Sequence, residues 1–228
     1  RTSVDRFDIM NPATGEAEGS TLMADGAVVD EAVGHAERVA QEFADMPADA
    51  RAAILNKTAD LMEQRVEEMS RLLTREQGKP VYDNTKEILF GAEVLRYYAA
   101  ESVRMHGSLR VSASPHIKNI VSYHPVGVTA AIVPWNYPID LYCWKIGPAI
   151  ATGCPMIVKS PHETPLAISM LVDCLHEAGM PAGALADLPG LGPVAGSALA
   201  RHPRIRMISA TASIAAGQDI MRNAACKQ

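Results

Sequence analysis

The sequence predicts an α/β fold in which a parallel sheet with helices on both faces follows a helical segment and a β-hairpin arm. Apolar residues recur at three- and four-residue spacing through residues 26–105, a pattern typical of amphipathic helices. Residues 107–123 change to extended stretches around a turn. From Gly127 onward, short apolar runs alternate with helical patterns, and this alternation favours a parallel sheet.

The amino-terminal part, residues 1–106, is predicted to be helical. We expect three helices there, over residues 26–45, 49–77 and 83–105. Gly78, followed by Lys79 and Pro80, should end the second helix, because glycine is favoured just after a helix and proline cannot continue one. Four residues of the third helix are expected to face the core: Leu89, Val94, Leu95 and Tyr98.

Residues 107–124 are predicted to form a hairpin arm. Apolar residues flank the turn-forming stretch Ser114-Pro115-His116 on both sides: Leu109, Val111, Ile117, Ile120 and Val121. Such a ribbon exposes apolar surface to water, so we expect another subunit to cover it.

Residues 125–228 are predicted to form the α/β part. Strands are expected over residues 128–133, 156–159, 184–188 and 205–209. Helices are expected over residues 139–152, 164–178, 194–200 and 214–224. Ligands of parallel sheets bind beyond the carboxyl ends of the strands, so the segments that follow these strands are candidates for a site.

Composition narrows the classes of function. The 228 residues are 48% apolar and 21% charged, which argues against disorder and against a coiled coil. A net charge of −5 without a basic face argues against nucleic acid and anionic membrane as partners. No apolar run reaches the ~20 residues of a membrane span. The cysteines lack metal-ligand spacing, so we expect no metal site and reduced thiols in a cytoplasmic protein: Cys143, Cys154, Cys174 and Cys226.

Asn136 stands out in the stretch Pro134-Trp135-Asn136-Tyr137-Pro138, directly after a predicted strand. Its uncharged amide, framed by two prolines, could donate hydrogen bonds to a developing oxyanion. The same asparagine could instead cap the helix that follows. The residues alone leave both readings open.

Two further strand ends offer chemistry for binding a cofactor. Lys159 ends an apolar strand, where it could donate to a ribose hydroxyl or a phosphate; a surface lysine is the alternative. Gly190, Gly192 and Gly196 lie between a strand and a helix, where glycine permits close approach of a phosphate. Helix–strand packing also uses glycines, so this pattern is weak by itself.

Taken together, these segments resemble the aldehyde dehydrogenase superfamily along essentially the whole chain. The order and spacing of eight stretches match the amino-terminal part of that family: NPATGE (11–16), EQGKP (76–80), LRYYA (95–99), HPVGV (124–128), PWNYP (134–138), WKIGPAIATGC (144–154), VKSPHETP (158–165) and PGLGPVAG (189–196). The resemblance implies a Rossmann-like fold, an NAD or NADP cofactor and an aldehyde substrate attacked by a cysteine. It also implies a homodimer or homotetramer that assembles through the hairpin arm.

The resemblance also assigns roles to residues. Asn136 would stabilise the oxyanion of a thiohemiacetal, and Lys145 would lie close to it. Lys159 would bind the adenosine ribose, with Pro161 and His162 in the same segment. The other cofactor-binding residues lie along the dinucleotide: Ile132, Val133, Pro134, Trp135, Gly192, Gly196, Ser209 and Thr211.

Three departures from the family pattern matter. His162 stands where the family commonly has a glutamate that holds the ribose and repels a 2′-phosphate, so we expect NADP to be accepted at least as well as NAD. Ala210 replaces a glycine at the point where the backbone approaches the pyrophosphate. The family's general-base glutamate and nucleophilic cysteine lie downstream of Gln228, and Cys143 is expected to face the interior instead of replacing the nucleophile.

The sequence is compatible with three functions. We expect the cofactor-binding half of an aldehyde dehydrogenase, without its catalytic domain and therefore inactive alone. A truncated, non-catalytic dinucleotide-binding module is the alternative from a different class, and a coenzyme-A-acylating relative is a nearer one. Tyr137, Leu141 and residues 90–95 would form one wall of the aldehyde tunnel.

Overall fold

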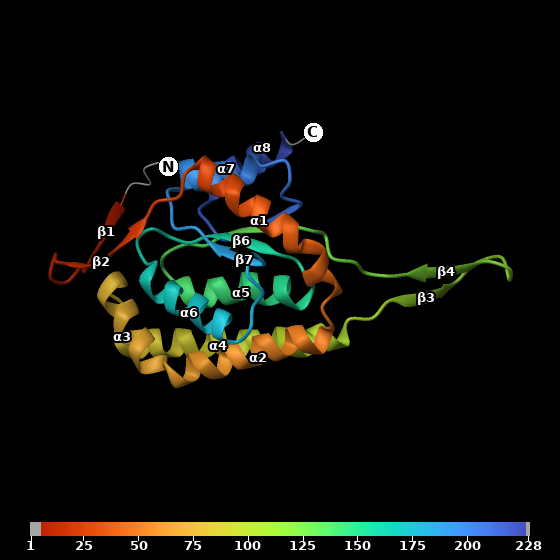
Figure 1. Ribbon diagram of the computed structural model, residues 1–228, viewed down its shortest axis with the longest axis horizontal. Helices are drawn as coiled ribbons and strands as arrows, with labels where there is room; N and C mark the ends of the chain where they lie inside the picture. Colours follow the sequence, from red (N-terminus) through yellow and green to blue (C-terminus); the bar gives the residue numbers. More distant parts are fainter. Residues whose placement is uncertain (1–5, 227–228) are drawn as a thin grey trace.

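The computed structural model describes residues 6–226, which form layers of helices around a central sheet, with two projecting hairpins (Figure 1). The sheet is parallel, with its strands in the order β7-β6-β5-β8. The strands are β5 (Thr129–Ile132), β6 (Met156–Lys159), β7 (Leu185–Asp187) and β8 (Met207–Ala210). β5 and β6 are buried along their whole length, as expected for apolar strands covered on both faces. The predicted α/β fold is confirmed.

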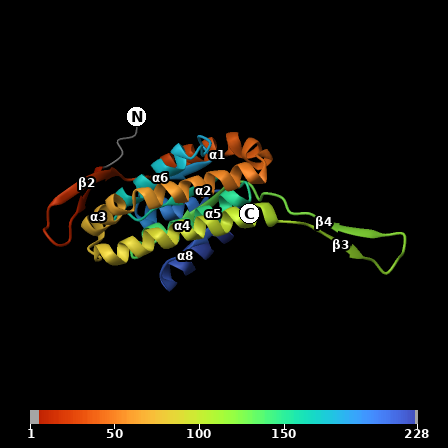
Figure 2. The same cartoon turned by 90° about the horizontal axis from the view of Figure 1, so that it is seen from below.

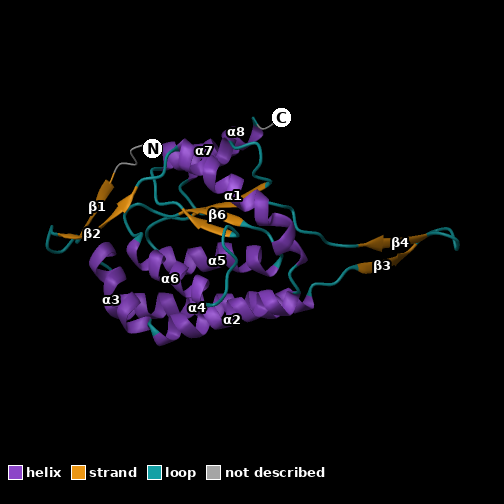
Figure 3. Cartoon of the chain, in the orientation of Figure 1, coloured by secondary structure: helices purple, strands orange, loops and turns teal. Residues whose placement is uncertain are grey.

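Helices cover both faces of this sheet (Figures 1 and 3). On one face lie α5 (Pro138–Ala151) and α6 (Leu166–Glu177), with α2 (Ala48–Gln64) and α4 (Val81–Arg104) as an outer layer. On the other face lie α1 (Gly26–Asp45), α7 (Ser197–Arg201) and α8 (Ile214–Ala225). The core is divided accordingly into two clusters, a larger one around Leu95 and Tyr142 and a smaller one around Val33 and Leu199.

The predicted helix over residues 49–77 is divided at Arg65 into α2 and α3 (Val66–Gln77), so the prediction of one continuous helix was wrong. The Arg65 guanidinium bonds to the Glu177 carboxylate and lies 3.5 Å from Cys174 Sγ, both near the end of α6. The interruption therefore coincides with contacts to another helix, which the apolar pattern along residues 49–77 does not reveal. α3 then ends at Gly78, whose φ of +87° is the left-handed conformation predicted for this position.

Two buried glutamates satisfy the amino-terminal ends of α5 and α6. Glu87 of α4 accepts a hydrogen bond from Ile139 N at 2.9 Å in the first turn of α5. Glu76 of α3 accepts one from Leu166 N at 2.7 Å in the first turn of α6. Both carboxylates also lie at the positive ends of helix dipoles. Burial raises the pKa of Glu76 to about 7 and raises the pKa of Glu87 above its ordinary value.

Two antiparallel hairpins project from opposite sides of the molecule (Figures 1 and 2). β3 (Ser108–Val111) and β4 (Lys118–Val121) form the predicted arm, in which Val111 is 97% exposed. β1 (Arg6–Met10) and β2 (Ala17–Leu22) form a second hairpin that was not predicted. Its strands are short and mostly exposed, so they carry little of the apolar alternation that marks a half-buried strand.

Smaller differences and agreements complete the comparison. Leu89 is 38% exposed instead of facing the core, whereas Val94 and Leu95 are buried as predicted. The helix predicted over residues 194–200 begins with a π-helical turn (Gly192–Gly196) before α7. All four cysteines are free thiols, as predicted. Within residues 6–226, no helix has both the length and the apolar character of a membrane span.

Candidate cofactor and oxyanion site

The carboxyl ends of β5, β6 and β8 meet at one edge of the sheet, where they bring predicted cofactor-binding residues together. Ile132 is paired with Lys159 on one side and with Ala210 on the other. Beyond the strands, Val133 N donates to Lys159 O at 3.2 Å and Thr211 N donates to Ile132 O at 3.0 Å. Ile132 therefore lies at the centre of the candidate site.

A cavity of about 160 Å³ opens beside Ile132, between the π-helical turn and Ile220 of α8. Gly196 lies against the strand ends, since a Cβ built there would be 3.7 Å from Ile132 Cδ1 and 3.9 Å from Lys159 Cδ. A Cβ built on Gly192 would meet nothing within 4 Å, so its backbone borders open space. A glycine-lined and largely apolar cavity of this kind suits the flat ring of a nucleotide.

Lys159 is buried, with 6% of its surface exposed, so the alternative of a surface lysine was wrong. Burial lowers the pKa of its ammonium group, and the carboxylates of Glu163 and Asp187 oppose that shift. A buried cation beside the glycine-lined cavity is suited to donate to ribose hydroxyls or a phosphate.

Pro161 and His162 follow Lys159, and the His162 ring packs on β1. It meets the ring of Phe7 edge-on, with 5.3 Å between centroids, and its Nδ1 lies 3.1 Å from Glu163 Oε2. Pro161 is buried. This segment therefore keeps a carboxylate, Glu163, although histidine occupies the family's glutamate position.

The end of β8 carries the remaining predicted cofactor residues. Ser209 pairs with Ala131 in the strand register, and Thr211 is the first residue beyond the strand. Both are half-buried, whereas Ala210 between them is exposed. Two hydroxyl-bearing residues thus flank a small residue at this edge of the sheet.

Asn136 does not cap α5, so the interpretation as a helix cap was wrong. The N-cap residue is Tyr137, and no side chain bonds in the usual capping manner there. The N–H groups of Ile139 and Asp140 donate to Glu87 instead. Asn136 is exposed just before the helix begins, where its amide can serve another partner.

The EQGKP stretch holds the backbone of Asn136 in place. Gln77 Nε2 donates to the carbonyl oxygens of Trp135 at 2.7 Å and Asn136 at 2.9 Å. Lys79 Nζ donates to the same Asn136 oxygen at 3.3 Å. The position of the Asn136 peptide is therefore set by two side chains from outside its own turn.

Lys79 links the Asn136 carbonyl group to Glu87, the buried carboxylate that caps α5. It bonds to the Glu87 carboxylate, and its ammonium lies 4.0 Å from the centre of the Tyr137 ring. Gln77, Lys79 and Glu87 were not predicted as site residues. The EQGKP motif pointed to the first two, but their partners lie more than fifty positions away along the chain.

α5 carries the other predicted site residues. Lys145 is half-buried, and burial lowers its pKa. Cys143 is fully buried as predicted, and burial raises the pKa of its thiol well above its ordinary value, which disfavours a thiolate nucleophile. Trp144 lies between two aromatic rings of α4, 6.4 Å from Phe90 and 6.0 Å from Tyr98 between centroids.

Comparison with known proteins identifies the family. The model described as "Aldehyde dehydrogenase family" matches residues 1–228. Glutarate-semialdehyde dehydrogenase of Pseudomonas putida is 35% identical over 217 residues, which are 95% of this chain and 45% of that protein. An NADP-dependent enzyme of E. coli superposes with a TM-score of 0.96 at 33% identity, covering 98% of this chain and 46% of that one.

PnpE in complex with NAD superposes with a TM-score of 0.94 at 32% identity, again over 98% of this chain and 46% of the other. The chain thus spans less than half the length of these proteins. The Rossmann-like fold and the resemblance carried by the motifs are confirmed. The chain belongs to the aldehyde dehydrogenase family.

Proposed function

We propose that these 228 residues form the cofactor-binding half of an enzyme that oxidises an aldehyde to a carboxylic acid with NAD or NADP. The observation that carries the proposal is that Ile132, Lys159 and Gly196 meet at the edge of the sheet, beside a cavity lined by Ile132 and Gly196. Asn136 is held just beyond β5, the strand that ends at Ile132. The nucleophilic cysteine and the general base are proposed to lie outside this chain, since Cys143 is buried.

The residues at the carboxyl edge of the sheet fit a dinucleotide. Lys159 would donate to ribose hydroxyls, and the hydroxyls of Ser209 and Thr211 at the end of β8 would donate to a phosphate. Gly192 and Gly196 would let backbone groups approach the ligand, and residues 132–135 would line its path. When bound, the nicotinamide supplies the hydride acceptor for the oxidation.

Asn136 is proposed to donate its amide N–H to the aldehyde oxygen that becomes negative when a thiolate adds to the carbonyl carbon. Its backbone is fixed by Gln77 and Lys79, so the donor does not have to be reorganised during the reaction. Lys145 is proposed to add positive potential to the same oxygen. Tyr137, Leu141 and the aromatic side chains of α4 would form a wall for the aldehyde.

The full-length enzyme should oxidise aldehydes with NAD or NADP, whereas the isolated 228-residue polypeptide should bind the dinucleotide without turnover. NAD(P)H formation with an aldehyde panel measures turnover, and quenching of tryptophan fluorescence measures binding. Turnover by the isolated polypeptide that Cys143→Ser abolishes would contradict the proposal. A full-length protein that binds the cofactor but oxidises no aldehyde would instead support a non-catalytic dinucleotide-binding module.

The full-length enzyme should use NADP at least as well as NAD, because His162 does not repel a 2′-phosphate. His162→Glu places a second carboxylate beside Glu163 and should shift the ratio of kcat/KM values towards NAD by about tenfold, or ~1.4 kcal/mol. His162→Gln is the matched control, since it removes the imidazole without adding charge. An unchanged ratio in His162→Glu would show that cofactor choice is set elsewhere.

The arm is proposed to join subunits into a homodimer or homotetramer. Leu109 faces Ile120 across the hairpin, and both are more than 60% exposed (67% and 78%). Burying such a pair stabilises an interface, so Leu109→Asp with Ile120→Asp should dissociate the full-length enzyme. Analytical ultracentrifugation measures the change, and Asn119→Asp on the other face of the arm is the control. A wild-type protein that sediments as a monomer would contradict the assignment.

A further inference from the structure

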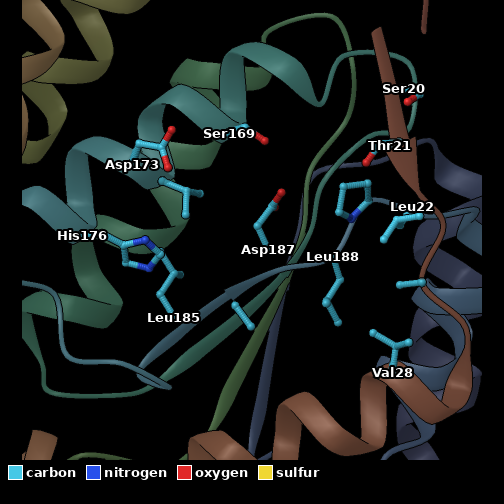
Figure 4. A pocket seen from close by; sticks show the side chains of 14 residues that line it. Ser20, Thr21, Leu22, Val28, Ser169, Asp173, His176, Leu185, Asp187 and Leu188 are labelled. Carbon is cyan, nitrogen blue, oxygen red and sulfur yellow. The ribbon is translucent and has the colours of Figure 1, made fainter. Parts of the chain in front are cut away.

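A second cavity, of about 730 Å³, lies beside β7, which is an edge strand of the sheet. α6 forms one wall, β2 and the start of α1 form the opposite wall, and β7 with the residues after it forms the floor (Figure 4). None of the residues assigned above to the cofactor lines it. It is therefore a separate cavity from the one assigned to the cofactor, although Asp187 on its floor lies within the electrostatic reach of Lys159.

The floor of the cavity carries a buried carboxyl group. Asp187 is the last residue of β7, and in Figure 4 its side chain points into the cavity between α6 and β2. Its Oδ2 accepts a hydrogen bond from Ser160 Oγ at 3.1 Å. Its Oδ1 is buried and has no partner of hydrogen-bonding geometry among the residues that the structure describes. A buried carboxyl oxygen without a partner is costly, and a ligand with a donor would offset that cost.

Groups on neighbouring elements set the charge of Asp187. Burial raises the pKa of its carboxyl group to about 7, against the opposing effects of Ser160, of the Tyr142 hydroxyl on α5 and of the Lys159 ammonium on β6. The Tyr142 hydroxyl interacts with this carboxyl from the packed side of the sheet and lowers its pKa, although the pair does not reach the distance and angles of a full hydrogen bond. These protein groups therefore leave Asp187 only partly compensated.

The remaining lining of the cavity is polar on one side and apolar on the other. Asp173 and His176 lie on the α6 wall, and neither lysine nor arginine is among the lining residues. Val28, Leu185 and Leu188 form the apolar side. Negative charge without a lining cation favours a positively charged ligand, and the apolar side favours a carbon chain attached to it.

We propose that this cavity binds a primary alkylammonium ion. The ammonium group donates to Asp187 Oδ1 and lies within the field of Asp173, and the alkyl chain lies against Val28, Leu185 and Leu188. The hydroxyl groups of Ser169 and Thr21, which border the same cavity, can accept the remaining N–H donors.

The test is isothermal titration calorimetry of the full-length protein with n-pentylammonium chloride. Saturable binding is expected, and 1-pentanol, which keeps the alkyl chain but lacks the charge, should bind at least about tenfold more weakly. Asp187→Asn should weaken binding of the cation by about tenfold or more, because it removes the charge and nearly preserves the shape. Sodium chloride at the same concentration controls for ionic strength.

A second variant keeps the proposal falsifiable if Asp187→Asn does not fold. Ser169 is exposed on α6 at the cavity, so Ser169→Phe should fill the space and block binding without touching the Asp187 hydrogen bonds. Asp173→Asn, at an exposed position on the same helix, should weaken binding much less than Asp187→Asn. Binding of pentanol as tightly as pentylammonium, or unchanged binding in Ser169→Phe, would overturn the proposal, as would absence of binding.

Proton release gives a readout that a merely structural role for Asp187 would not produce. At pH 6 the Asp187 carboxyl group, with its pKa raised to about 7 by burial, is mostly protonated. A bound cation favours the carboxylate, so binding should release a proton at pH 6 and fewer protons at pH 8. Titrations in buffers of different ionisation enthalpy measure this release. Asp187→Asn should abolish it, and release that persists in that variant would contradict the assignment.

Discussion

Asn136→Ala in the full-length enzyme should lower kcat by about 10²–10³-fold, the usual effect of removing one oxyanion donor. The Asn136 amide is exposed beyond the end of β5 and does not cap α5. The substitution should therefore slow the chemical step and leave the folded structure intact. The affinity for NAD should change little, because Lys159 and the glycine-lined cavity remain.

The measurement is kcat under conditions where the chemical step is rate-limiting, together with the dissociation constant for NAD. Gln77→Ala is a comparison variant with a smaller expected effect on kcat. It removes two hydrogen bonds to the Trp135 and Asn136 carbonyl groups but leaves the Asn136 amide present. It should reduce kcat less than Asn136→Ala does. Wild-type kcat in Asn136→Ala would remove this residue from the proposed mechanism.

Glu87→Ala should reduce the free energy of unfolding by about 3 kcal/mol, the lower end of the range for breaking a buried ion pair from one side. The Glu87 side chain is fully buried and is bonded to Lys79 and to N–H groups in the first turn of α5. Its removal leaves a largely buried ammonium without its carboxylate and leaves helix donors unsatisfied.

Urea denaturation followed by circular dichroism gives the free energy of unfolding. Glu93→Ala is the matched control, since Glu93 is an exposed glutamate on the same helix and its loss should change stability by less than about 0.5 kcal/mol. Because Lys79 also holds the Asn136 carbonyl group, Glu87→Ala should lower kcat as well. Equal stability of the two variants would mean that Glu87 is not an important capping group.

The sheet and its strand ends could be predicted because their signals are local. The alternation of apolar strands with helices identified β5, β6 and β8 as well as the segments that follow them. Lys159, Gly196 and Ile132 were placed at one site because parallel strands end at a common edge. The left-handed Gly78 was also predictable from its own neighbours.

The parts that could not be predicted depend on contacts between distant segments. At the interruption, Arg65 bonds to Glu177, which is 112 positions away, so this contact could not be read from the local sequence. The contacts of Gln77 and Lys79 with Asn136 arise from the packing of α3, α4 and α5 against one another, so the local sequence does not predict them. For the same reason, the sequence left the two readings of Asn136 open until Glu87 was found to occupy the capping role.

The two capping glutamates also bear on how the chain folds. Glu87 and Ile139 are 52 positions apart, and Glu76 and Leu166 are 90 positions apart. The capping bonds of α5 and α6 therefore cannot form before α4 and α3, respectively, have docked on them. Long sequence separations of this kind slow folding and couple distant segments into one transition. Residues 125–228 expressed without the preceding helices would then lack both caps, so we expect the helical and α/β parts to unfold together in one transition.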